Sequence, residues 1–175
     1  MIRKIDMTDR KFRLRVIQDI SSLEDKTILH LDEVAAQRIS ERIKLWSAFN
    51  LEWTCLLIGK VTVVGKEPAI VVEDIIEIPP LPDNDLVAKI VVEALKMFSE
   101  RVVGVLRFHP DGNLYPNFAD LLIFLVSDLR LERPHKHVIV SPSGESLVLS
   151  FSRCWNCENS FFKAFPRVEV REDDR

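Results

Sequence analysis

Two β-rich hairpins, separated by helix-forming segments, set the strongest limit on how this chain can fold. Residues 51–64 and 69–78 are rich in β-branched side chains, and the GKEP between them is a turn signal. Residues 137–142 and 146–151 form a similar pair around an SGE turn. Because helical segments lie between the hairpins, the sequence predicts an α/β (α+β) fold in which a mixed sheet is flanked by helices.

Two amphipathic helices are expected on either side of the first hairpin. One begins after Asp32, a favourable N-cap, and ends near Asn50, with apolar residues at helical spacing (Ala35, Ile39, Ile43 and Trp46). The other begins at Asp83 or Asn84 and continues to about Glu100. Each helix has an apolar face that can pack on the sheet.

Residues 102–120, VVGVLRFHPDGNLYPNFAD, join a short apolar strand to a turn-rich loop and to the start of a third helix. The strand is expected over residues 102–108 and the helix over residues 118–131. Residues 121–126 are all apolar, so this helix is expected to be deeply buried, and Pro134 ends it.

A single domain accounts for most of the chain. The 175 residues, of which 47% are hydrophobic, suffice for one sizeable core and are too few for two comfortable ones. We expect a domain over residues 30–153, with an N-terminal extension (1–29) packed on it and a C-terminal extension (154–175). The first 28 residues suit an edge strand or short helix, and the last residues suit a charged, frayed end.

Charge and hydropathy argue against two classes of partner. The net charge of −3 offers no broad attraction to a phosphate backbone, so no nucleic-acid partner is expected. No segment approaches the roughly 18 uninterrupted apolar residues that span a bilayer, and the charged start lacks a signal-peptide core. Three cysteines are too few for a secreted disulfide framework. These features predict a soluble, cytoplasmic protein without membrane contact.

Two further groups of potential ligands lie towards the C-terminus. Cys154 and Cys157 have the spacing of a metal knuckle or redox pair, but a four-cysteine zinc site needs a second pair that the chain lacks. Incidental or buried cysteines, a local disulfide and a metal shared across a dimer remain alternatives. His135 and His137 share one face at a strand edge and are expected on the surface, without a carboxylate partner.

Charged residues in or next to two of the predicted strands and the third helix carry the chemistry that the sequence indicates. Glu52 begins EWTCLLIG in the first hairpin, RFHP ends the short strand, and NFAD opens the third helix. A catalytic zinc needs three ligands with lone pairs and an open position for water. His109 and Asp120 supply two such ligands. The guanidinium of Arg107 stays protonated and has no lone pair to offer.

This arrangement resembles the signature of the MPN domain family, whose catalytic members, the JAMM metalloproteases, remove ubiquitin or ubiquitin-like modifiers. The signature is a Glu in an early strand, then His-x-His-Pro, seven residues and Ser-x-x-Asp. The order of elements agrees over residues 30–153. However, Arg107 replaces the first histidine, Asn117 replaces the serine, and six residues separate Pro110 from Asn117.

The resemblance implies a role for each matching residue. Glu52 would match the general base, and Asn117 the position that orients water or stabilises the oxyanion. His109 and Asp120 would match metal ligands. The resemblance also implies an MPN/cytidine-deaminase-like sheet, pairing of copies through helices, and a protein partner such as a ubiquitin-like protein or another MPN subunit.

With Arg107 at the third ligand position, these residues are expected to be vestigial and no cofactor is expected. We predict instead that Arg107 forms a cluster with Glu52 and Asp120 in the former metal cavity. The chain is then a catalytically inactive interaction or scaffold domain.

The sequence is compatible with two alternatives. Asn117 and Asp120 have the N-cap and N3 spacing of a capping box, which would explain both residues without any chemistry. The chain could also be a divergent zinc-dependent isopeptidase that recruits Asp111 or Glu73 as its third ligand, with zinc as cofactor.

Overall fold

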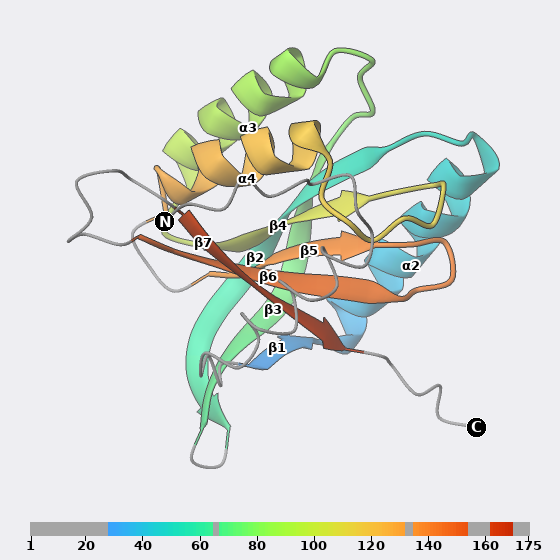
Figure 1. Ribbon diagram of the computed structural model, residues 1–175. Coiled ribbons are helices and arrows are strands. Elements are labelled where there is room, and N and C mark those ends of the chain that lie inside the picture. Colours follow the sequence, from blue (N-terminus) through green and yellow to red (C-terminus); the bar gives the residue numbers. More distant parts are fainter. Residues whose placement is uncertain (1–27, 65–66, 132–134, 154–161, 170–175) are drawn as a thin grey trace, which may run out of the picture.

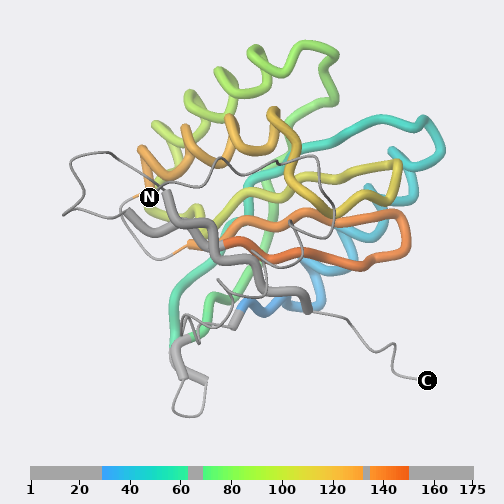
Figure 2. The backbone as a smooth tube through the Cα atoms, in the orientation of Figure 1, coloured from blue at the N-terminus to red at the C-terminus, as the bar shows by residue number. Residues whose placement is uncertain are grey.

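A computed structural model of the chain describes residues 28–64, 67–131, 135–153 and 162–169 (Figures 1 and 2). Strands and helices alternate along most of this length. In chain order the elements are β1 (Ile28–Leu31), α2 (Glu33–Ala48), β2 (Trp53–Val64), β3 (Glu67–Ile78), α3 (Asn84–Phe98), β4 (Val102–Phe108), α4 (Phe118–Asp128), β5 (His137–Val140), β6 (Ser146–Arg153) and β7 (Phe162–Glu169).

The described strands form one sheet in the order β1-β3-β2-β4-β5-β6-β7. The β2–β3, β2–β4, β5–β6 and β6–β7 pairs are antiparallel, whereas β1–β3 and β4–β5 are parallel. Both predicted hairpins are present, as β2–β3 and β5–β6. The predicted mixed sheet with flanking helices is therefore confirmed.

Helices cover both faces of this sheet (Figure 1). α2 packs on one face, and α3 and α4 pack together on the other. Because successive residues of a strand point to opposite faces, Cys55 and Leu57 join the core under α2, whereas Leu56 and Ile58 join the core under α3 and α4. The molecule has two apolar layers, one on each side of the sheet.

Side-chain caps begin the three helices where the sequence predicts them. Asp32 caps α2, Asp83 caps α3 and Asn117 caps α4, each by accepting a backbone N–H from the first turn. α4 ends at Asp128, before the predicted end at residue 131. The N–H groups of the two residues after its C-cap both bond to the carbonyl of Ser127, which closes the last turn tightly.

Two strands were not predicted. β1 adds a short parallel strand beside β3 at one edge of the sheet. β7 adds a strand beside β6 at the other edge, where the sequence indicated only an apolar patch before a frayed end. Pro166 weakens the strand signal in β7, yet proline is tolerated in an edge strand because a ladder bond is not needed on its open side.

Some predictions concern features that the described residues cover only in part. Cys154, Cys157, residues 1–27 and residues 170–175 lie outside the described ranges.

Cys55 is a free cysteine in the core, and burial raises the pKa of its thiol well above the usual value. None of the helices in the described part of the chain has the length and apolar character that a membrane crossing requires.

Candidate functional site

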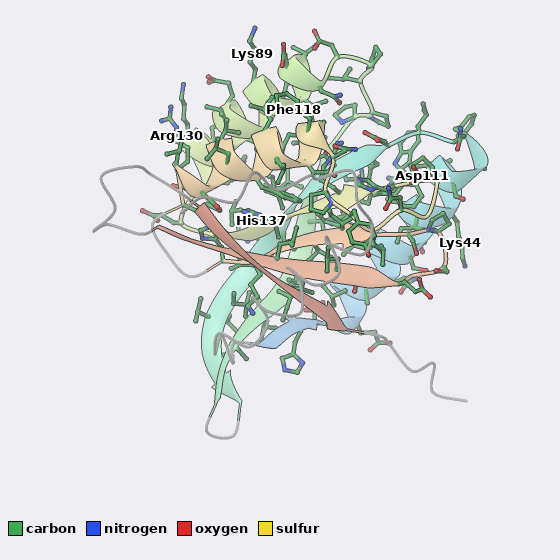
Figure 3. All side chains as sticks on the ribbon, viewed as in Figure 1. Lys44, Lys89, Asp111, Phe118, Arg130 and His137 are labelled. Atoms are coloured by element: carbon green, nitrogen blue, oxygen red, sulfur yellow. The ribbon has the colours of Figure 1, made fainter. Side chains whose placement is uncertain are left out.

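The residues singled out in the sequence meet at one end of the sheet, where β2 begins, β4 ends and α4 begins. Glu52 directly precedes β2, and His109 directly follows β4. Thr54 and Arg107 face each other across the antiparallel β2–β4 pair. The loop and helix that border this end carry Asp111 and Phe118, labelled in Figure 3. We call the group the Arg107 cluster (Glu52, Thr54, Arg107, His109, Asn117 and Asp120).

Arg107 is the centre of this cluster. Its side chain is only 2% exposed, and its Nε donates to Asp120 Oδ1 at 2.7 Å. Nη1 donates to Thr54 Oγ1 at 2.7 Å, and Nη2 donates to Glu52 Oε2 at 2.8 Å. Each guanidinium nitrogen thus has an oxygen acceptor, as a buried charge requires. The predicted contacts of Arg107 with both carboxylates are confirmed.

Asp120 is fully buried and accepts hydrogen bonds from three directions. Besides Arg107, its donors are His109 Nε2, at 2.9 Å from Oδ2, and the backbone N–H of Asn117, at 2.7 Å from Oδ2. Burial raises the pKa of this carboxyl group. The hydrogen bond and charge of His109, together with the Arg107 guanidinium, outweigh burial and hold the pKa of Asp120 below its ordinary value.

His109 lies between two oxygen acceptors. Its Nδ1 is 2.5 Å from the carbonyl oxygen of Asn113, and its Nε2 faces the Asp120 carboxylate. A carbonyl and an ionised carboxylate can only accept, so both ring nitrogens carry protons. Burial lowers the pKa of His109, but the hydrogen bond and charge of Asp120 and the bond to Asn113 outweigh it, so the pKa is raised. His109 is therefore an imidazolium without a lone pair for a metal.

The charges of the Arg107 cluster balance without a metal ion. Arg107 and His109 are cationic, and Glu52 and Asp120 supply two carboxylates. A zinc ion here would add two positive charges to a buried guanidinium and would have to displace the Nε2 proton of His109. As arranged, these residues fit a closed group of ion pairs and do not fit a three-ligand zinc site.

Asn117 and Glu52 connect this cluster to the surface. Asn117 Oδ1 accepts the backbone N–H of Asp120 at 2.9 Å, which completes a capping box with the Asp120 side chain. The prediction that Asn117 and Asp120 form a capping box is thus confirmed. The same Asp120 carboxylate also accepts the hydrogen bond from Arg107. Asn117 Nδ2 lies 3.4 Å from Glu52 Oε1, and the Glu52 side chain is 42% exposed. Glu52 is the half-exposed carboxylate of the cluster.

Neither of the two proposed replacement ligands joins the Arg107 cluster. Asp111 is exposed, and its Oδ1 accepts the backbone N–H of Asn113 at 3.0 Å within the loop. Glu73 pairs with Lys60 at 2.9 Å, far along the β2–β3 pair from Thr54. Recruitment of Glu73 as a third ligand is therefore wrong, because the strand register separates it from Arg107.

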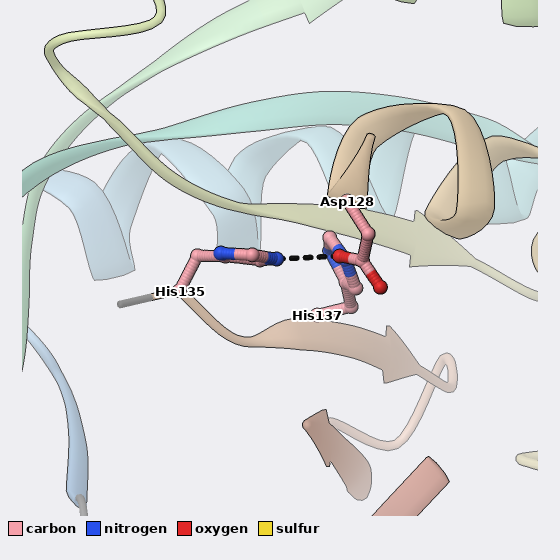
Figure 4. Close-up of side chains that lie close together, drawn as sticks. All are labelled: Asp128, His135 and His137. Carbon is pink, nitrogen blue, oxygen red and sulfur yellow. Dashed lines mark hydrogen bonds and ion pairs between the residues drawn. The ribbon is translucent and has the colours of Figure 1, made fainter. Parts of the chain in front are cut away.

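A second histidine–carboxylate cluster lies at the opposite end of α4 (Figure 4). Asp128 is the last residue of α4, His137 begins β5, and His135 precedes β5. Asp128 Oδ1 lies 2.7 Å from His137 Nε2 and also contacts His135 Nε2. His137 is fully buried, and the His135 side chain is 10% exposed. The prediction that both histidines lie on the surface without a carboxylate partner is therefore wrong.

We call this group the His137 cluster (Asp128, His135 and His137). His137 Nδ1 accepts the backbone N–H of Val105 at 3.1 Å, so Nδ1 is unprotonated and Nε2 carries the proton that is donated to Asp128. Burial lowers the pKa of His137 and outweighs the hydrogen bond and charge of Asp128, which raise it. The Phe124 ring stacks on this imidazole with centroids 4.6 Å apart. His137 is a neutral, structural histidine.

The packing around His137 also explains a glycine in β4. The N–H of Lys136 bonds to the carbonyl of Val103 at 2.9 Å, where β4 and β5 approach each other. A Cβ atom on Gly104 would lie 1.6 Å from the carbonyl oxygen of Lys136. The close approach of the two strands therefore requires glycine at residue 104.

The His137 cluster has the spacing of a metal site but the wrong proton arrangement. Its ligand atoms all lie within 4.8 Å of one another. A metal-bound histidine offers one unprotonated nitrogen to the ion and normally donates a hydrogen bond through the other. His137 has the reverse arrangement, with the proton on Nε2 and an accepting Nδ1. The cluster fits a hydrogen-bonded connection between α4 and β5.

Comparisons with known proteins add no family to this description. A scan against protein-family models finds no match for the chain, and a search of curated proteins finds none either.

Sequence reasoning missed the His137 cluster and Thr54. The sequence held a partial signal for the His137 cluster, because Asp128 lies within a helix predicted to be buried and His137 opens an apolar strand, and buried polar residues need partners. Thr54 faces Arg107 only once the register between β2 and β4 is known.

Proposed function

We propose that this chain is a catalytically inactive MPN-like domain that acts as a protein-interaction or scaffold module. The observation that carries the proposal is the Arg107 guanidinium, which bonds to Glu52 and Asp120 at the position where the family signature has a metal ligand. The protonated His109 supports the same conclusion, because its Nε2 is occupied by a proton and cannot hold zinc.

The way the cluster assembles supports the likeness to the MPN signature. The resemblance relates residues at the start of β2, the end of β4 and the start of α4, which lie far apart in the chain, from Glu52 to Asp120. These residues are in contact with one another in the fold. A degenerate MPN-type site would have both this order of residues in the chain and these contacts.

Exposed apolar residues next to the cluster support an interaction role. Phe118, adjacent to Asn117, is 81% exposed, and Leu51, adjacent to Glu52, is 43% exposed. Phe49, two residues before Leu51, is 63% exposed. Exposed aromatic and aliphatic residues around a polar site are typical of protein-binding surfaces. We propose that the partner is a ubiquitin-like protein or another MPN-type subunit.

Metal content tests the inactive state. The chain is purified without chelator, incubated with zinc, and its bound zinc is measured by elemental analysis beside two variants. We expect the wild type and Arg101→His, an exposed control, to bind no zinc, and Arg107→His to bind about one equivalent. Zinc in the wild type, lost on His109→Ala, together with cleavage of a ubiquitin isopeptide substrate, would overturn the proposal in favour of the isopeptidase.

Titration with ubiquitin, followed by NMR of labelled ubiquitin, tests the interaction role. We expect binding that Phe118→Ser weakens and that Met97→Ser leaves unchanged. Met97 is a matched control because it is 76% exposed on α3. Absence of ubiquitin binding would reject the ubiquitin-like partner. A self-association measurement by light scattering would then test the MPN-type pairing, and a strictly monomeric chain would reject that as well.

A further inference from the structure

The two faces of the sheet are unequally covered by helices. α3 and α4 lie on one face, whereas α2 lies alone on the other. α2 packs against β3 and β1, so the part of this face formed by β4, β5 and β6 lies to one side of the helix. A groove of about 370 Å³ occupies the angle between α2 and these strands.

The floor of this groove is apolar and its rim is polar. Leu106, Val138, Val140 and Val148 form much of the floor, together with Ile39 and Ile43 of α2. Ser40 and Lys44, one helical turn apart on α2, line the same groove as Ser143 and Gly144 of the β5–β6 turn. A pocket of this size, largely apolar with a few polar groups, is typical of a small-molecule site.

The charge on the rim of the groove is positive and lies on α2. Among the described residues that line the groove, Lys44 is the single charged side chain, and carboxylates are absent from the lining. Lys44 is exposed and is labelled in Figure 3. A ligand with an anionic group at the α2 rim and an apolar body against the strands would complement this lining.

We propose that this groove binds an amphipathic carboxylate of the fatty-acid type. The carboxylate pairs with Lys44 and accepts from the hydroxyls of Ser40 and Ser143, while the aliphatic chain covers the strands. The volume of about 370 Å³ accommodates a chain of medium length. None of the residues of the Arg107 cluster lines this groove, so the proposal is independent of the proposed interaction function.

Calorimetric titration with decanoate tests this site, with decanol as the uncharged analogue. We expect saturable binding of one decanoate to the full chain and weaker binding of decanol. Lys44→Met should weaken decanoate binding about threefold to fivefold, as expected for a partly exposed ion pair, and leave decanol binding unchanged. Lys89→Met is the matched control because Lys89 is an exposed lysine of α3 on the opposite face.

Ser40→Trp supplies a second test, because it fills the groove from an exposed position of α2 without altering the core. We expect this variant to fold with an unchanged circular dichroism spectrum and to lose decanoate binding. Decanoate should raise the melting temperature of the wild type, since a ligand of the native state stabilises it.

Three results would overturn the proposal. One is the absence of decanoate binding by the full chain, including the case in which another segment of this chain occupies the groove. Another is binding that survives Ser40→Trp. The third is equal binding of decanol and decanoate with no effect of Lys44→Met, which would indicate an unspecific apolar surface.

Discussion

The two ends of α4 each hold a histidine against a buried aspartate, yet the two histidines are in opposite protonation states. At the Asp120 end, His109 lies between two acceptors and is cationic. At the Asp128 end, His137 lies between an acceptor and the N–H of Val105 and is neutral. The carboxylate is common to both, so the partner of the second ring nitrogen decides the charge.

The hydrogen bonds of both histidines also differ from those of a metal-bound histidine. A zinc-binding histidine needs one free lone pair and one donated hydrogen bond. His109 has two donated hydrogen bonds, and His137 has its lone pair directed at a backbone amide. The pKa values of the two side chains are shifted accordingly, upward for His109 and downward for His137.

The largest effect is expected when Arg107 is removed, because Asp120 is then left as a buried carboxylate with less compensation. Arg107→Met should lower the free energy of unfolding by about 3–5 kcal/mol. Arg42→Met is the control, since Arg42 pairs with Glu77 in a partly exposed position and its replacement should cost about 1 kcal/mol or less. Urea denaturation measures both. Equal effects of the two variants would contradict a central role for Arg107.

Replacement of His137 tests the hydrogen bonds assigned to this neutral histidine. His137→Leu leaves the N–H of Val105 without this acceptor and removes a donor from Asp128, so we expect a loss of about 2–3 kcal/mol. His137→Gln, whose amide can accept and donate, should recover part of that loss. His30→Leu is an exposed control with an expected change within about 0.5 kcal/mol. No difference between Leu and Gln at residue 137 would contradict the assigned hydrogen bonds.

The pH dependence of stability should differ in sign between the two histidines. Because the folded pKa of His109 is raised, its stabilising contribution is complete below the unfolded value of about 6.5 and is lost as pH rises through the folded pKa. The folded pKa of His137 is depressed, so its contribution is present above about 6.5 and is lost as pH falls through the folded pKa.

His109→Gln should therefore reduce the loss of stability on the alkaline side, and His137→Gln should reduce the loss on the acid side. The depressed pKa values of Asp120 and Asp128 add a further loss at lower pH, as each carboxylate is protonated through its folded pKa. Urea denaturation across the pH range measures these slopes. Identical slopes for the two histidine variants would refute the opposite assignments.

The smallest expected effect concerns the cap that positions Asp120. Asn117→Ala removes the side-chain acceptor for the Asp120 N–H and should cost about 1 kcal/mol. Asp83→Ala removes the matching cap of α3, which among the described residues is not attached to an ion-pair cluster, and should cost a similar amount. Only Asn117→Ala should also shift the titration of His109, seen by proton NMR. If the titration of His109 is unchanged in Asn117→Ala, the cap does not position Asp120 for the Arg107 cluster, which would contradict this prediction.

The regular elements of this fold were predictable because their signals are local. Caps at Asp32, Asp83 and Asn117 and the hairpin turns lie within a few residues of the elements they begin or join. β7 was missed because Pro166 interrupts its pattern and its pairing with β6 is tertiary.

The contacts of the Arg107 cluster were predictable from a spaced signature, whereas the sequence indicated only that Asp128 and His137 would need polar partners, without saying which ones. The contacts of Arg107 follow because this cation stands at a metal-ligand position of the signature, next to its two carboxylates, Glu52 and Asp120. The partner of His137 is set by where the chain returns after α4, which no local pattern specifies. The charge of each histidine depended on a backbone group, Asn113 or Val105, and backbone positions become known only with the fold.

Nitrogen NMR of the imidazole side chains near neutral pH tests the central claim most directly, because it reports which ring nitrogens carry protons. The expected result is two protonated nitrogens in His109, one protonated nitrogen (Nε2) in His137, and no change in either on addition of zinc. An unprotonated Nε2 in His109, or a His109 signal that moves when zinc is added, would contradict the assignment of the Arg107 cluster as a metal-free group of ion pairs.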